Sequence, residues 1–95
     1  MGANVLFAKL ECPRCGYASD VEVETTIDNQ GHARDYRLGD VVDWLPGQRP
    51  ESGNRTTDGY VVCPVCGKDF FVIVTIESDR VARVEVDKAR PGYIR

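Results

Sequence analysis

A five-residue motif, Cys-Pro-x-Cys-Gly, occurs twice in this chain, at residues 12–16 and again at residues 63–67. The two-residue spacing between the cysteines lets one loop turn both thiolates toward the same metal ion. Proline has its φ fixed at about −65°, and the glycine after the second cysteine can adopt the positive φ that such a loop requires. Two loops brought together supply four sulfurs in a tetrahedron. The sequence therefore predicts one metal site with the ligands Cys12, Cys15, Cys63 and Cys66.

Zinc is the metal expected at this site, because a closed tetrathiolate shell is typical of structural zinc, and iron is the alternative. Two disulfides would need an oxidising compartment, and a thioredoxin-like redox site would need one Cys-x-x-Cys motif at the start of a helix. His32, the single histidine, is expected in a turn because four thiolates already complete the shell. Arg14 and Lys68 lie beside ligands in the sequence and are expected to soften the negative charge of the site.

With these two loops the chain resembles zinc ribbons, and residues 36–44 resemble small uncharacterised bacterial and phage zinc-ribbon proteins. The resemblance covers the loops and the adjoining strands, implies the four cysteines as ligands, and carries no activity with it. Residues 15–17 with Asp20, and residues 62–67, are also similar to the iron-binding loops of rubredoxins, which are electron carriers. The chain departs from rubredoxins in its longer segment between the loops, in Pro13, and in the apolar hairpin after the second loop.

The hydrophobic pattern predicts an all-β chain, and the resemblance implies that it is a small metal-stapled fold of the zinc-ribbon kind. A strand over residues 5–11 runs into the first loop, and residues 21–27 alternate apolar and polar side chains at period two. Turn formers at residues 28–32 predict a hairpin between residues 21–27 and a returning strand at residues 33–38. Residues 60–62 lead into the second loop, and residues 70–76 and 81–86 predict another hairpin, with its turn at residues 77–79.

The remaining segments carry weaker patterns. Residues 39–44 are assigned to strand or turn, and Trp44 is expected to cover the core. Residues 45–59 contain several Pro and Gly residues without periodicity, which predicts an extended loop. Residues 88–95 are expected to form an irregular C-terminal tail.

A length of 95 residues predicts one domain, residues 1–95, with a core too small to be stable without a staple such as the metal. Structural zinc contributes on the order of 10–16 kcal/mol of binding free energy in peptide sites, so the apo chain is predicted to be largely unfolded or molten. Neither a signal peptide nor a transmembrane segment is recognisable, and the expectation is a soluble, cytoplasmic protein.

The leading interpretation of the function is a structural zinc-binding ribbon that acts as a protein-interaction or accessory module. Nucleic-acid binding is an alternative that the net charge of −3 disfavours, and a rubredoxin-like electron carrier is another. A closed tetrathiolate site has no open position for substrate, so no enzymatic activity is expected. The residues that would contact nucleic acid are Arg80, Arg83, Lys88, Arg90 and Arg95, with Tyr93 for base stacking.

Overall fold

The computed structural model describes residues 4–27, 35–44, 47, 49–90 and 92 of the chain. None of these residues is α-helical, and most of them belong to strands, which confirms the all-β prediction. A single turn of 3₁₀ helix, η1 (Glu51–Gly53), precedes the fourth strand. The strands are β1 (Asn4–Glu11), β2 (Ala18–Thr25), β3 (Asp35–Arg37), β4 (Arg55–Val62), β5 (Asp69–Glu77) and β6 (Arg80–Val86).

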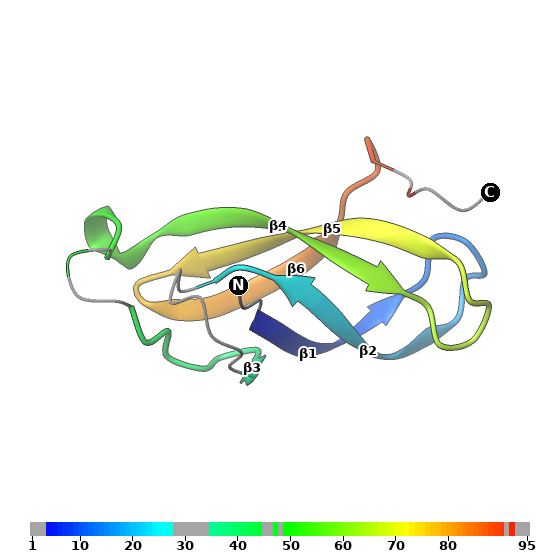
Figure 1. The fold of residues 1–95 in the computed structure, drawn as a ribbon, viewed down its shortest axis with the longest axis horizontal. Coiled ribbons are helices and arrows are strands. Elements are labelled where there is room, and N and C mark those ends of the chain that lie inside the picture. The colour runs from blue at the N-terminus through cyan, green and yellow to red at the C-terminus, as the bar shows by residue number, and fades with distance from the viewer. Residues whose placement is uncertain (1–3, 28–34, 45–46, 48, 91, 93–95) are drawn as a thin grey trace.

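One curled sheet contains all of these strands, in the order β3-β1-β2-β4-β5-β6 (Figure 1). Antiparallel pairing runs along the full lengths of β1 with β2 and of β4 with β5. The two cysteine loops are the turns of these two hairpins, and Figure 1 shows both turns at the same end of the sheet. Only two residue pairs, Glu24 with Tyr60 and Thr25 with Gly59, join β2 to β4. The fold is therefore two long hairpins that meet along a short seam.

The predicted hairpin between residues 21–27 and residues 33–38 is wrong, because β3 pairs in parallel with β1. The register aligns Val5 with Asp35 and Phe7 with Arg37. β2 is not available to β3, since β1 covers one edge of it and β4 takes its C-terminal end. The loop of residues 12–17 connects β1 to β2 directly, so their pairing costs little loop-closure entropy and is favoured over pairing of β2 with β3. The predicted turn at residues 28–32, His32 included, lies outside the described residues.

The predicted extended loop over residues 45–59 is wrong from residue 51 onward, where η1 and then β4 begin. Residues 55–58 pair with residues 73–76 of β5, an apolar strand that supplies a continuous partner. Gly59 is buried within β4, and a Cβ there would lie 2.4 Å from Cγ1 of Val23. This glycine is required by the close approach of β2 and β4, although in the sequence it looks like part of a loop.

The second predicted hairpin is confirmed, because β5 and β6 pair in antiparallel fashion around a turn at Ser78 and Asp79. Residues 39–42 then join β6 at the end of the sheet opposite the cysteine loops, through an isolated bridge between Val41 and Arg80. The amide of Val42 donates to the carbonyl of Asp79 at 2.7 Å. The assignment of residues 39–44 to strand or turn thus corresponds to a single bridge.

The core lies on one face of the curled sheet, where side chains of alternate strand residues meet. In β5, Phe70, Val72, Val74 and Ile76 are buried, while the residues between them are half-buried. Trp44 packs against this core, as predicted. Of the predicted C-terminal tail, positions 88–90 and 92 are described and form no strand. No described helix has the length and apolar character needed to cross a membrane.

Candidate metal centre

The two cysteine loops have the same backbone conformation. In the first, the amide of Gly16 donates to the carbonyl of Cys12 at 2.8 Å, and in the second, the amide of Gly67 donates to the carbonyl of Cys63 at 2.9 Å. Gly16 and Gly67 have φ values of 78° and 75°, the positive φ predicted from the sequence. Each loop also closes with a bond from its first cysteine amide to the carbonyl five residues later, at 3.0 Å and 2.8 Å. The repeated motif therefore folds into a repeated structure.

The two loops bring all four cysteine sulfurs together. Their Sγ atoms lie within 4.8 Å of one another, and the Cys12–Cys66 and Cys15–Cys63 distances are each 3.9 Å. None of the four is in a disulfide. Four sulfurs in a regular tetrahedron around zinc stand about 3.8 Å apart, since the Zn–S bond is about 2.3 Å. The spacing of the predicted ligands therefore fits one tetrahedrally coordinated metal ion.

Backbone amides point at the sulfurs in both loops. The amide of Arg14 lies 3.3 Å from Sγ of Cys12, and the amide of Val65 lies 3.4 Å from Sγ of Cys63. These donors are the polar environment that a thiolate needs, and they stabilise its negative charge. The same arrangement in both loops supports thiolate ligands on each side of the site.

The pKa values of the thiols differ across the cluster. Hydrogen bonds from the amides of Cys66 and Val65, aided by neighbouring thiols, lower the pKa of Cys63 to about 7 against the effect of burial. The amide of Tyr17 lowers the pKa of Cys15, but burial and the three other thiols outweigh it and raise that pKa to about 11. One sulfur ionises readily and another resists, because adjacent negative charges repel. A bound cation is what allows all four to be thiolates together.

The site is continuous with the core on one side and reaches the surface on the other. Cys12 and Cys63 are buried and belong to the core cluster, whereas Cys15 is exposed and Cys66 is intermediate. A metal held by these four sulfurs would be bonded to both hairpins, next to the buried side chains of the core. This geometry suits a structural role, in which metal binding is coupled to folding.

Arg14 and Asp69 link the two loops beside the cysteines. The Nη1 group of Arg14 donates to the backbone carbonyl of Asp69 at 2.8 Å and lies 3.6 Å from its Oδ1 atom. Asp69 is fully buried, and the Tyr60 hydroxyl donates to its Oδ2 atom at 2.8 Å. Arg14 was expected beside the site, and its side chain reaches across to the other hairpin. Lys68 contributes its backbone carbonyl, which accepts from the amide of Cys63.

Sequence reasoning missed Asp69, because an acidic residue at the start of an apolar strand looks like a solvated strand end. The available signal was its position two residues after the second loop, next to Lys68. That position lies opposite Val62 in the second hairpin, and Arg14 of the first loop reaches it.

Comparison of the chain with protein families, with curated proteins and with solved structures finds no significant match. The four-cysteine cluster is of the kind found in zinc ribbons, and it is a candidate metal centre with a structural role.

Proposed function

We propose that this chain is a zinc-stapled β-ribbon that serves as a protein-interaction or accessory module without enzymatic activity. The observation that carries the proposal is the set of four sulfurs within 4.8 Å of one another, held by two matched loops from separate hairpins. Such a site fills every coordination position with protein ligands and leaves none for water or substrate. Its contribution is then the rigidity of the surface that it supports.

Zinc is proposed over iron because a closed tetrathiolate shell that anchors a small core is the usual structural zinc arrangement. Elemental analysis of the purified protein, with an absorbance spectrum of the same sample, tests this choice. The expected result is one zinc per chain and a colourless solution. One iron per chain with a visible thiolate-to-iron absorption band would replace the proposal with a rubredoxin-like electron carrier. A matched control is a variant with Cys15 and Cys66 replaced by serine, which should retain neither metal.

Nucleic-acid binding has less support, because the three described arginines of the predicted patch are already engaged. Arg83 is paired with Glu77 at 2.6 Å and with Glu85 at 3.0 Å, and Arg90 is paired with Asp58 at 2.7 Å. Arg80 donates to a backbone carbonyl, that of Gly39. Guanidinium groups that are satisfied in this way have less capacity for phosphate. Arg95 and Tyr93 lie outside the described residues.

The partner class is tested by affinity capture of the metal-loaded full chain from the cells that make it, followed by mass spectrometry. A captured protein that is lost when the cysteine variant is used as bait supports the interaction module. Recovery of nucleic acid in a salt-sensitive complex, with no enriched protein, would contradict it and favour the alternative.

A further inference from the structure

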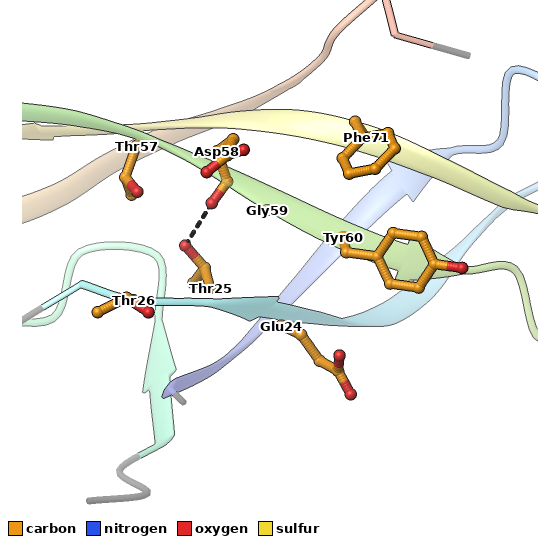
Figure 2. Close-up of a pocket in the computed structure, with 8 residues that line it drawn as sticks. All are labelled: Glu24, Thr25, Thr26, Thr57, Asp58, Gly59, Tyr60 and Phe71. Atoms are coloured by element: carbon orange, nitrogen blue, oxygen red, sulfur yellow. Dashed lines mark hydrogen bonds between the residues drawn. The ribbon is translucent and has the colours of Figure 1, made fainter. Parts of the chain in front are cut away.

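The seam between β2 and β4 opens into two hollows with volumes of about 390 Å³ and about 370 Å³. Glu24 and Tyr60, which form one of the two pairs that join these strands, line both hollows. The first hollow extends to Thr26 and Thr57, as Figure 2 shows, and the second extends to Asp20 and Pro64. We call the two together the seam groove. It runs along the line where the two hairpins diverge.

One wall of the seam groove carries unpaired negative charge. Asp20, Glu22 and Glu24 alternate along β2 with buried valines, so their side chains share the exposed face at intervals of about 7 Å. Within the described part of the chain, none of these three carboxylates has a hydrogen bond or an ion pair. Asp58 and Asp79 differ, since each has an arginine partner.

The other wall carries Thr57 and Asp58 in the first hollow and is apolar in the second. Val62 lies on β4 with half of its surface exposed, Pro64 follows it in the second cysteine loop, and the rings of Tyr60 and Phe71 contact each other at 5.3 Å. Neither hollow is lined by a lysine or an arginine. In addition, residues 18–23 of β2 have no strand partner on the side that faces β4 in the described structure. The space between the two strands is therefore open to an extended chain whose side chains alternate between the two walls.

We propose that the seam groove binds an extended segment of another protein in which basic residues alternate with apolar ones. Lysine or arginine side chains two residues apart match the spacing of Asp20, Glu22 and Glu24, because a strand repeats every two residues. The apolar side chains between them fit against Val62 and Pro64. An acidic segment or a nucleic acid would meet repulsion from the same carboxylates. This inference rests on the proposed function and specifies its partner chemistry.

A labelled hexapeptide, Lys-Val-Lys-Val-Lys-Val, provides the probe, and fluorescence anisotropy with the metal-loaded protein provides the measurement. Saturable binding that weakens as salt rises is expected, together with no binding of Glu-Val-Glu-Val-Glu-Val and weaker binding of Lys-Ser-Lys-Ser-Lys-Ser. Replacing Glu22→Gln and Glu24→Gln together should weaken binding by roughly threefold or more. Val62→Ala should weaken it further, since apolar contact is lost.

Matched controls separate the seam groove from general attraction between opposite charges. Glu11→Gln with Glu51→Gln removes the same charge outside the groove, and Val41→Ala trims an equally exposed valine at the opposite end. Both controls should bind the probe as the wild type does. Equal loss in the controls and the groove variants, or no saturable binding, would overturn the inference. Self-association in light scattering that the Glu22 and Glu24 changes abolish would also overturn it, by making a second copy the occupant.

Failure of this inference is distinguishable from failure of the proposed function. Metal content and captured partner proteins report on the function, whichever surface is used. A captured protein that binds the double Glu22 and Glu24 variant as well as the wild type would leave the function standing and refute the groove as its site.

Discussion

Asp69 joins the two hairpins beside the four cysteines. Its carboxylate is fully buried and receives the Tyr60 hydroxyl, while its backbone carbonyl receives Arg14 from the other hairpin. Gly92 packs directly over it, since a Cβ at that position would lie 2.6 Å from its Oδ1 atom. A buried carboxylate is tolerated only when its oxygens are satisfied, so these neighbours and the charge stabilise one another.

Replacing Asp69→Asn should lower the free energy of unfolding by about 3 kcal/mol, because it removes one member of a buried charged network. Tyr60→Phe should cost about 1 kcal/mol, since it deletes one hydrogen bond and leaves the charge in place. Urea titration of the metal-loaded variants measures both effects, and a competing chelator measures metal affinity. An Asp69→Asn variant as stable as the wild type would show that the network contributes nothing.

Gly53→Ala should also destabilise the protein, by about 1–3 kcal/mol, because Gly53 combines a positive φ of 68° with close packing. A Cβ there would stand 2.7 Å from the backbone nitrogen of Asp79, which cannot move without disturbing the β5–β6 turn. Gly39→Ala is the matched control, since its φ of 89° is also positive but no atom lies within 4 Å of the added Cβ. Equal unfolding midpoints for the two variants would contradict a steric role for Gly53.

The turn between β5 and β6 stabilises the end of the sheet opposite the cysteines, where Val42 and Trp44 donate hydrogen bonds to Asp79. Ser78 and Asp79 have φ values of 51° and 67°, a conformation in which Asn-Gly is the preferred sequence. Asp79 nevertheless stabilises this turn through its carboxylate, which accepts hydrogen bonds from Trp44 Nε1 at 2.8 Å and from Arg49. The hydrogen bonds from Arg49 and Trp44 lower the pKa of Asp79 below its ordinary value of 3.8.

Changing Ser78→Asn should therefore stabilise the protein by about 0.5 kcal/mol, since asparagine tolerates positive φ better than serine does. Asp79→Gly should destabilise it even though glycine suits the turn, because Trp44 and Arg49 lose their acceptor. Thermal unfolding of the two single variants tests whether conformation or side-chain contacts dominate. A stabilised Asp79→Gly variant would show that the turn conformation alone matters.

The elements with local sequence signals could be predicted, and those that depend on the assembled sheet could not. Both cysteine loops and the β5–β6 hairpin were predicted, because their signals lie in local spacing, in glycine φ requirements and in alternation. The partner of β3 was not, since parallel pairing with β1 depends on which strand edges the rest of the fold leaves open. β4 was partly hidden because Gly59 serves packing with Val23, which only the assembled sheet reveals. Asp69 was missed for the same reason, since its partners Arg14 and Tyr60 reach it only in the folded sheet.

At the scale of the whole molecule, two hairpins diverge from a seam of two residue pairs and are rejoined at both ends. At one end the four cysteines and the contact from Arg14 to Asp69 hold them together. At the other end residues 39–42 bridge to β6 and Trp44 packs on the core. Removing the metal breaks the link between the hairpins at the cysteine end and leaves the contacts at the other end in place. The metal-free chain should therefore lose structure from the cysteine end inward.

Hydrogen exchange during metal removal by a strong chelator tests this order. Amides of the two loops and of the adjoining ends of β1, β2 and β4 should exchange first, because the thiolates repel one another once the cation has gone. Amides at the centre of the β5–β6 hairpin should follow later, since its pairing runs along both strands and its apolar residues are buried. Structural zinc contributes on the order of 10 kcal/mol in peptide sites, as much as a small domain's whole stability, so global unfolding should then follow at 25 °C. Re-addition of zinc should restore protection at both ends, which shows that the loss is reversible.

Protection that remains uniform after chelation, with a cooperative thermal transition like that of the loaded protein, would refute the structural role of the metal.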